Sequence, residues 1–166
     1  MDLLDADDYP AETGDTFLEN ARGKALHGRE VGPTGSLFLG EDSGLEVDAL
    51  GGAPGVHTAR WAEGRHVERI LEALAGVEDR RARYVCELVA LWPDGRERRG
   101  TGTLAGRIAE EPRGSAGFGF DPVFVPDGEE RTVAELGDAW KAEHSHRARA
   151  ARALRDELAE PTGRSV

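Results

Sequence analysis

The sequence has little cysteine and no long apolar run, and each absence argues against a class of protein. Cys86 is the only cysteine among 166 residues. No disulfide can therefore form within the chain, and a reducing cytoplasm is the expected compartment. No apolar stretch approaches the roughly 18 residues that a membrane span needs. The opening MDLLDADDYPAETG has neither the basic nor the apolar region of a signal peptide. A secreted disulfide-rich module and an integral membrane protein are thus disfavoured.

Positive charge is also scarce. The chain has 21 Lys and Arg residues against 32 Asp and Glu residues, which gives a formal net charge of −11. Such a balance argues against wrapping nucleic acid polymers or coating an anionic bilayer. The length suits one domain, since domains commonly hold roughly 100–200 residues, and it can bury a core without disulfides or a structural metal. Seven acids and no base in residues 1–20 predict a solvated, partly frayed terminus.

Helical and strand patterns alternate along the chain, which is typical of an α/β fold. Thr16 and Glu19 have the spacing of a helix capping box. Strand formers on both sides of Trp92–Gly95 predict a β-hairpin. The expected helices are 16–30, 65–75 and 129–158, the last interrupted near 142–145, where Ser145 would cap the final helix. The expected strands are 36–40, 45–50, 84–92, 96–109 and 122–126.

The first candidate site is the acidic segment Glu41–Gly44, placed where the predicted strand 36–40 ends and the chain turns. In open α/β sheets, ligands bind at the carboxyl ends of the strands. A carboxylate such as Asp42, followed by small residues, can approach a hard cation such as Mg²⁺. Taken alone, an acidic turn of this kind is more often only a turn.

Glu12 lies just ahead of the first predicted helix. The helix dipole favours a carboxylate there whatever its role, so the position has a structural explanation too. To act as a second metal ligand, Glu12 would have to meet Asp42 in space. Lys24, on the same helix, is either a substrate contact or solvated surface.

Cationic residues gather near a predicted helix start in the segment Lys141–Arg147. Backbone N–H groups, the helix dipole and cationic side chains together make an anion site. Cations at a helix N-terminus are unfavourable by a few tenths of a kcal/mol or more unless an anion compensates. Because local rules are most often broken where function resides, this segment indicates a binding site.

Between these segments lies the glycine-rich loop Gly117–Pro122, GFGFDP. Glycines permit close backbone approach, and aromatic faces can stack on a planar base. The competing interpretation is a tight loop whose two phenylalanines plug the core. A nucleotide or another phosphate ester would suit all three segments, but the residues alone do not select the reaction.

Four segments, taken in order, resemble the inosine/xanthosine triphosphate pyrophosphatase family, enzymes that remove non-standard purine nucleotides. They are ETGDTFLENARGKA (Glu12–Ala25), GEDSGLEVDALGGAPGVHTARWA (Gly40–Ala62), GFGFDPVFVP (Gly117–Pro126) and TVAELGDAWKAEHSHRARA (Thr132–Ala150). Together they cover most of the chain, which makes the match far more specific than one short motif. The resemblance implies an elongated mixed β-sheet with flanking helices, forming two lobes around a central cleft that holds the active site.

The resemblance also implies Mg²⁺-dependent hydrolysis of ITP, dITP or XTP to the monophosphate and pyrophosphate, which sanitises the nucleotide pool. Asp42 would be the proton acceptor that activates water and, together with Glu12, a metal ligand. The other residues carried over would bind the substrate: Ser43, Phe118, Gly119, Phe120, Asp121, Lys141, His146 and Arg147. A pocket built for a 6-oxo group leaves a polar group unpaired when the 6-amino group of adenine enters. A cytoplasmic homodimer is expected, with no membrane or nucleic acid polymer as partner.

The sequence departs from the family pattern in two places. Glu41 stands where the family usually has Asp, which keeps the charge and adds one methylene. Family members normally begin with a strand and a helix carrying a Thr/Ser-x-Asn-x-x-Lys motif that grips the triphosphate. The domain 1–166 is expected to lack that strand and that motif. We therefore expect reduced stability and weaker triphosphate binding, which restoring the upstream reading frame would reverse.

Three functions remain in view at this point. The leading one is a Mg²⁺-dependent nucleoside triphosphate pyrophosphatase. The second is a catalytically impaired nucleotide-binding protein of the same fold, which would bind inosine triphosphate without releasing pyrophosphate. The third is a non-catalytic interaction domain, which would bind no nucleotide.

Overall fold

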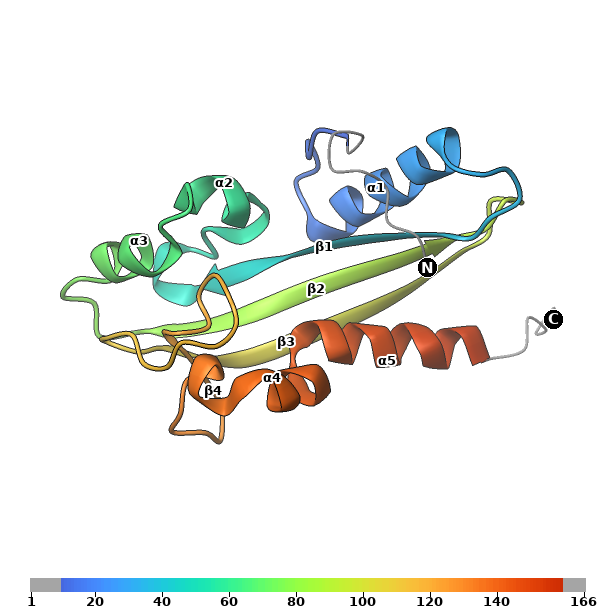
Figure 1. Ribbon diagram of the computed structural model, residues 1–166. Coiled ribbons are helices and arrows are strands. Elements are labelled where there is room, and N and C mark those ends of the chain that lie inside the picture. The colour runs from blue at the N-terminus through green and yellow to red at the C-terminus, as the bar shows by residue number, and fades with distance from the viewer. Residues whose placement is uncertain (1–9, 160–166) are drawn as a thin grey trace, which may run out of the picture.

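The computed structural model describes residues 10–159, which are built on a four-stranded sheet in the order β1-β2-β3-β4. The strands are β1 (Phe38–Val47), β2 (Arg81–Leu91), β3 (Glu97–Ile108) and β4 (Phe124–Pro126). The three long strands give the sheet an elongated shape (Figure 1). The fold class is thus confirmed as an elongated sheet with flanking helices. Each neighbouring pair is antiparallel, so the described residues contain no parallel pair of the kind a mixed sheet would add.

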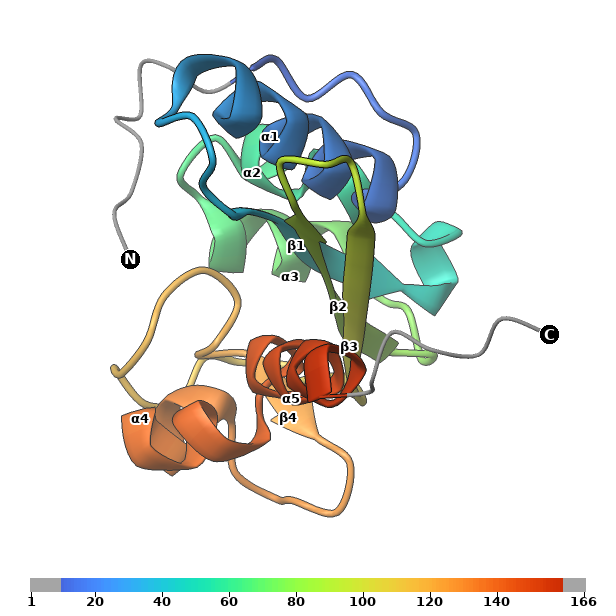
Figure 2. The ribbon, with the colours of Figure 1, turned by 90° about the vertical axis from the view of Figure 1, so that its right-hand side faces the viewer.

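Helices cover both faces of the sheet. In Figure 2, α1 (Phe17–Val31) and α2 (Thr58–Ala62) lie on one side, and α4 (Val133–His144) and α5 (His146–Ala159) lie on the other. The short helix α3 (His66–Ala73) lies near the end of the sheet at which β2 begins (Figure 1). Two helical layers therefore flank the sheet, one on each face.

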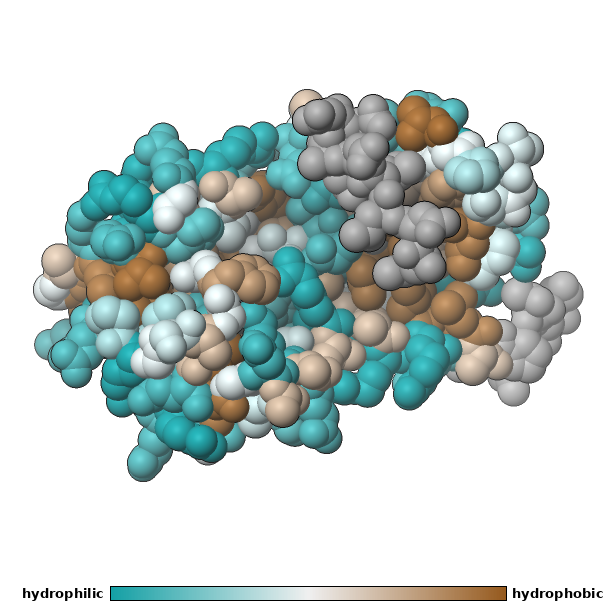
Figure 3. All heavy atoms as spheres, in the orientation of Figure 1, coloured by the Kyte–Doolittle hydropathy of each residue, from teal (hydrophilic) through white to brown (hydrophobic). Residues whose placement is uncertain are grey.

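The core has two parts, one on each face. Small residues of α1, Ala21 and Ala25, pack against Val89 and Leu91 of β2. The larger part lies on the opposite face and combines α3, the three long strands, the loop before β4 and the start of α4. Its fully buried members include Leu45, Ile70, Leu74, Phe120 and Phe124. Figure 3 shows hydrophobic side chains in the interval between α1 and α5 and others at the left, near α3.

Several local predictions are confirmed. Helix α1 begins after Thr16, and both hydrogen bonds of its capping box with Glu19 are formed. The hairpin joins β2 and β3 through the turn at Trp92–Gly95, where the Gly95 N–H donates to the Trp92 carbonyl at 3.0 Å. Ser145 separates α4 from α5 and accepts a bond from the Ala148 N–H at 3.2 Å. Each of these features depends on residues close together in the sequence.

The predicted turn at Glu41–Gly44 is wrong. The segment lies inside β1, which runs without interruption from Phe38 to Val47 and pairs with β2 along its whole length. The second predicted strand, 45–50, is accordingly the end of β1 followed by a 3-10 turn at Asp48–Leu50. Pairing across the sheet overrides the turn preference of Asp, Ser and Gly, because strand formation depends more on neighbours than on intrinsic propensity.

Two further points complete the comparison. The last helical region begins at Val133 rather than 129, after a second capping box made by Thr132 and Glu135. Of the stretch 1–20 predicted to fray, residues 1–9 lie outside the described residues, whereas Glu12 pairs with Lys24 and Glu19 belongs to α1. No helix formed by residues 10–159 is long and apolar enough to cross a membrane.

Candidate active site

Asp42 is the centre of a buried charged cluster on the α1 face of β1. Side chains alternate between the two faces of a strand, and a Cβ placed on Gly40, two residues earlier, would collide with the α1 backbone. Asp42 therefore points toward α1. Two side chains one helical turn apart, Asn20 and Lys24, meet it there. The Lys24 Nζ donates to Asp42 Oδ1 at 2.8 Å, and the Asn20 Nδ2 donates to Asp42 Oδ2 at 3.1 Å.

Lys24 joins the two predicted metal ligands. Its ammonium lies 2.7 Å from Glu12 Oε1 and also donates to the Glu41 carbonyl at 3.0 Å. With Asp42, all three N–H donors of the ammonium have partners. Burial by itself lowers the pKa of Lys24, but the bonds to Asp42 and Glu12 outweigh it, so the pKa is raised. Burial raises the pKa of Asp42, and the bonds from Lys24 and Asn20 only partly oppose that rise.

The donor set of this cluster suits a hard divalent cation. Glu12 and Asp42 present carboxylate oxygens to one cationic point, which Lys24 marks in this structure. Mg²⁺ is usually held by one or two carboxylates together with substrate phosphates and waters. Within residues 10–159, no group of three or more His, Cys, Asp or Glu side chains could hold a metal ion by itself. Glu12 and Asp42 could therefore supply part of the ligand set of such a cation.

A pocket of about 80 Å³ lies at the other face of β1 and reaches the strand edge. All eight residues predicted to bind substrate line it: Ser43, Phe118, Gly119, Phe120, Asp121, Lys141, His146 and Arg147. They come from β1, from the loop before β4, from the end of α4 and from the start of α5. The structure therefore brings together residues that lie about a hundred positions apart in the chain, such as Ser43 and Arg147.

Phe118 and Phe120 lie differently, although one residue separates them. Phe120 is 2% exposed and belongs to the core, whereas Phe118 is 64% exposed. The Lys141 Nζ lies 3.9 Å from the centre of the Phe118 ring, and the Arg147 guanidinium carbon lies 5.5 Å from it. An exposed ring beside two cations is a surface on which a planar, electron-rich base can stack. The core-packing interpretation of the loop is thus confirmed for Phe120, whereas base stacking on Phe118 stays a prediction.

Asp121 holds the loop and the lysine in place. Its Oδ2 accepts the Phe118 N–H at 2.8 Å and also pairs with the Lys141 ammonium. Asp121 is buried, so its charge is compensated by this ion pair and hydrogen bond rather than by water. Lys141 is consequently fixed beside the Phe118 ring.

Arg147 bridges the helix α5 to the strand β1. Its Nη2 donates to Ser43 Oγ at 2.8 Å and its Nε donates to Glu41 Oε1 at 3.2 Å. Glu41 is also the acceptor for the Cys86 thiol, at 3.5 Å. The carboxylate of Glu41 thus supplies the anion that the positive charge at the start of α5 requires.

His146 is a neutral, buried member of the pocket. Its ring stacks on that of Tyr84, with centroids 4.7 Å apart and planes 11° apart. Burial, followed by the charges of Arg147 and Lys141, lowers the pKa of His146 to about 3. The buried Nδ1 has no hydrogen-bond partner among the described residues. Since buried polar atoms are normally paired, this nitrogen is an exception among the residues that line the pocket.

That the cationic segment Lys141–Arg147 binds an anion stays a prediction, and its helical detail differs from the one expected. Lys141 lies in the last turn of α4, where the dipole favours a cation. His146 and Arg147 begin α5, and only Arg147 is charged there, since His146 is neutral. Within this segment, the unfavourable placement of a cation at a helix N-terminus is therefore confined to Arg147. The carboxylate of Glu41 compensates its charge.

The structure adds residues that the sequence did not single out. Asn20 contacts Asp42, while Tyr84, His66 and Thr58 line the pocket. Asn20 could have been found from composition, because it is the only Asn in a chain without Gln. Tyr84 and His66 have spacings that are ordinary for a core strand and a helix start, so no sequence signal distinguishes them.

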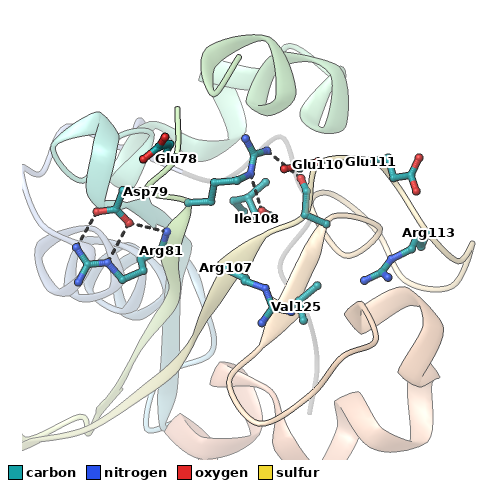
Figure 4. Close-up of a pocket in the computed structure, with 11 residues that line it drawn as sticks. Glu78, Asp79, Arg81, Arg107, Ile108, Glu110, Glu111, Arg113 and Val125 are labelled. Carbon is teal, nitrogen blue, oxygen red and sulfur yellow. Dashed lines mark hydrogen bonds and ion pairs between the residues drawn. The ribbon is translucent and has the colours of Figure 1, made fainter. Parts of the chain in front are cut away.

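A larger hollow, about 550 Å³, lies beside the start of β2 and the end of β3 (Figure 4). Arg80 there donates to the carbonyls of Ile108 and Ala109, and Arg81 pairs with Asp79. None of the predicted site residues lines this hollow. It is separate from the candidate active site.

Comparisons with known proteins agree with this architecture. The sequence matches the Ham1 family over residues 1–157. It is 48% identical over 145 residues to the dITP/XTP pyrophosphatase of Gloeobacter violaceus, covering 86% of this chain and 73% of that one. It is 51% identical over 146 residues to the dITP/XTP pyrophosphatase of Symbiobacterium thermophilum, covering 84% and 72%. The Ham1 protein structure of Staphylococcus aureus superposes with a TM-score of 0.82 at 36% identity, covering 89% of this chain and 79% of that one.

The fold and the site thus define an α/β protein with a buried carboxylate cluster beside an aromatic and cationic surface. The chain belongs to the Ham1 family.

Proposed function

We propose that the protein hydrolyses the triphosphates of deaminated purines, namely dITP, XTP and ITP, to the monophosphate and pyrophosphate. The observation that carries this proposal is that Asp42 and Ser43 are consecutive residues of β1. Asp42 belongs to the buried carboxylate cluster, and Ser43 lines the pocket that contains Phe118, here called the aromatic pocket. The names of the relatives from Gloeobacter violaceus and Symbiobacterium thermophilum support the same substrate class.

In this mechanism the pocket residues bind the base and the carboxylate cluster acts on the phosphates. The base stacks on Phe118, while the Arg147 guanidinium beside that ring offers polar contacts to the edge of the base. A 6-oxo group accepts hydrogen bonds, whereas the 6-amino group of adenine donates them. Adenine therefore leaves a donor of the pocket unpaired. This can cost a few kcal/mol of transition-state binding, which lowers kcat/KM for ATP.

Asp42 is the proton acceptor for the water that attacks the α-phosphorus. Its carboxylate is held from two sides, by Lys24 and by Asn20, so it reaches the reaction already oriented. Lys24 contributes positive charge beside the phosphates, where negative charge grows in the transition state. Glu12 and Asp42 would hold Mg²⁺, which would supply positive charge against the negative charge that grows on the phosphate oxygens.

The test is pyrophosphate release by the full chain with Mg²⁺, measured with ITP, XTP and ATP. We expect release from ITP and XTP but little from ATP. Asp42→Asn keeps the shape of the side chain and removes the proton acceptor, so it should reduce kcat by at least about 100-fold. Asp48→Asn, a neutralised carboxylate in the exposed turn after β1, is the matched control and should keep full activity. Equal release from ATP and ITP, or an active Asp42→Asn variant, would contradict the proposal.

We further propose that the protein acts as a homodimer in the cytoplasm. The family resemblance and the lone buried cysteine support these two points. Light scattering on the purified chain would give twice the monomer mass if the dimer forms. A monomer mass at micromolar concentration would contradict that part of the proposal.

A further inference from the structure

One buried side chain connects the two elements that carry the predicted metal ligands. Asn20 is 4% exposed and lies in the first turn of α1. Its Nδ2 donates to Asp42 Oδ2 at 3.1 Å, and its Oδ1 accepts the Gly14 N–H at 2.8 Å. Gly14 follows Glu12 by two residues, so Asn20 ties the loop that carries Glu12 to the strand that carries Asp42.

A carboxamide can make both bonds at once, because its nitrogen donates and its oxygen accepts. The Asp42 carboxylate accepts hydrogen bonds, and the Gly14 N–H donates one, so the side chain between them must donate on one side and accept on the other. Asn20 satisfies this in a single orientation of its amide. The chain contains no other Asn and no Gln. Asn20 is thus the single carboxamide side chain of the sequence.

The loop that carries Glu12 and Gly14 packs closely against the Asn20 amide. A Cβ added to Gly14 would lie 2.7 Å from Asn20 Oδ1 and 2.7 Å from Glu19 Cβ. Such contacts are too short for any real side chain. Glycine at position 14 therefore allows the approach that the Asn20 bond requires, and the two residues form one contact, which we call the Asn20–Gly14 clasp.

Glu12 is held from a second direction as well. The Arg60 Nη1 donates to the Glu12 carbonyl at 3.1 Å, and Lys24 pairs with its carboxylate. Lys24 reaches both carboxylates through a long, flexible side chain and can move when a cation arrives. The clasp, by contrast, acts through short, rigid groups. It is therefore the contact that can fix the distance between the two carboxylates when Lys24 moves.

We propose that Asn20 is a positioning residue, which sets the relative placement of Glu12 and Asp42 so that both can hold one divalent cation. This inference rests on the proposed function. Groups that orient metal ligands commonly change metal affinity or activity by about 10–100-fold when they are removed. A residue with a merely structural role would lower the melting temperature and leave metal affinity unchanged.

The first measurement is the Mg²⁺ concentration that gives half-maximal pyrophosphate release from ITP. For Asn20→Ala we expect this concentration to rise about 10-fold. The KM for ITP at saturating Mg²⁺ should change less than threefold, because the aromatic pocket is untouched. Asn20→Asp keeps the shape and places an acceptor against the Asp42 carboxylate, so its effect should be at least as large. Thr16→Ala weakens the same helix start without touching the amide, and it should leave the Mg²⁺ requirement unchanged.

The second measurement tests the clasp through its other partner. Gly14→Ala should raise the Mg²⁺ requirement in the same direction as Asn20→Ala, and the double variant should be no worse than the more affected single variant. Additive effects of the two substitutions would overturn the clasp, because they would show that each residue acts separately.

A third measurement needs no turnover. Mn²⁺ binding to the purified chain, followed by electron paramagnetic resonance, should weaken about 10-fold in Asn20→Ala. Unchanged Mn²⁺ affinity, or a change in melting temperature alone, would overturn the positioning role. If the wild-type chain released no pyrophosphate from ITP, the proposed function would fail, while the Mn²⁺ titration would still decide the role of Asn20.

Discussion

At the scale of single residues, the environment of a side chain assigns its role more firmly than its type does. Phe118 and Phe120 stand in the same six-residue loop, yet one faces solvent beside two cations and the other fills the core. The sequence offered base stacking and core packing as alternatives for both. Only the burial of each ring separates them.

Substituting the two phenylalanines should therefore give opposite results. Phe118→Ala should raise the KM for ITP about 10-fold or more, since stacking of a base on an aromatic ring contributes about 1–3 kcal/mol. Its melting temperature should stay unchanged. Phe120→Ala should lower the free energy of unfolding by about 3–5 kcal/mol, because it leaves a cavity in the core. Steady-state kinetics and urea unfolding of both variants check this, and a destabilised Phe118→Ala protein would contradict it.

His146 should make stability depend on pH in a predictable direction. Its pKa is about 3 in the folded protein because of burial and the charges of Arg147 and Lys141. In the unfolded chain, His takes up its proton near pH 6.5. Between these values the unfolded state binds more protons, so the free energy of unfolding falls as the pH falls below 6.5 and is level above it.

The size of that loss can be measured in a narrow window. From pH 6.5 to pH 5.5, one such histidine lowers the free energy of unfolding by about 1 kcal/mol. Urea unfolding at the two pH values should show this loss in the wild type and a loss smaller by that amount in His146→Gln. Equal losses in the two proteins would show that His146 takes up its proton in the folded state.

At the scale of elements, glycines of β3 decide how closely α5 approaches the sheet. A Cβ on Gly102 would lie 2.0 Å from the His146 carbonyl oxygen, and a Cβ on Gly100 would lie 2.3 Å from that of Ala150. The first turn of α5 carries His146 and Arg147. The position of these two pocket residues therefore depends on the absence of a side chain on the neighbouring strand.

Gly102→Ala should displace the start of α5 and with it Arg147. Because the clashing atoms belong to the backbone, the helix must shift as a whole, and we expect both a lower melting temperature and a loss of discrimination between ITP and ATP. Gly23→Ala is the matched control. A Cβ there meets nothing within 4 Å, and Ala favours a helix over Gly by up to about 1 kcal/mol. Full activity and specificity in Gly102→Ala would contradict this account.

The elements themselves were largely predictable, with one instructive failure. Helix α1, the hairpin and the break at Ser145 follow from caps and turns whose partners lie within a few residues. The segment Glu41–Gly44 was predicted as a turn because its composition is that of a turn. Pairing with β2, about 45 residues further along the chain, makes it a strand instead.

At the scale of the whole molecule, the distribution of lysine is informative. The chain has only two lysines, Lys24 and Lys141, because all its other cationic side chains are Arg or His. Lys24 pairs with Asp42 and Lys141 with Asp121. Both lysines of the protein therefore belong to the candidate active site, one in the carboxylate cluster and the other in the aromatic pocket.

An amine-specific reagent should thus act as a probe of the active site. Acetylation with an N-hydroxysuccinimide ester should abolish pyrophosphate release as Lys24 and Lys141 are modified, which mass spectrometry of peptides can follow. Saturating ITP with Ca²⁺ in place of Mg²⁺, chosen to slow turnover, should protect both lysines, and ATP should protect them less. Modification of both lysines with full retention of activity would show that neither serves the reaction.

The sequence by itself determined the class of fold, the start of α1 and the break between α4 and α5 at Ser145. These depend on local signals, since caps, turns and hydrophobic periods act over a few residues. The roles predicted for Glu12, Asp42 and the pocket residues remain predictions, although the structure gathers these residues into two adjacent groups.

Only the tertiary structure decided which side chains meet. Asn20 and Asp42 are 22 residues apart, and Arg147 and Glu41 are 106 residues apart, so their contacts depend on strand register and helix packing. The same holds for the exposure of Phe118 and the burial of Phe120. Such contacts form only once strands have paired in one register and helices have packed on one face of the sheet. Both events depend on the burial of apolar surface over the whole chain, which no local segment determines.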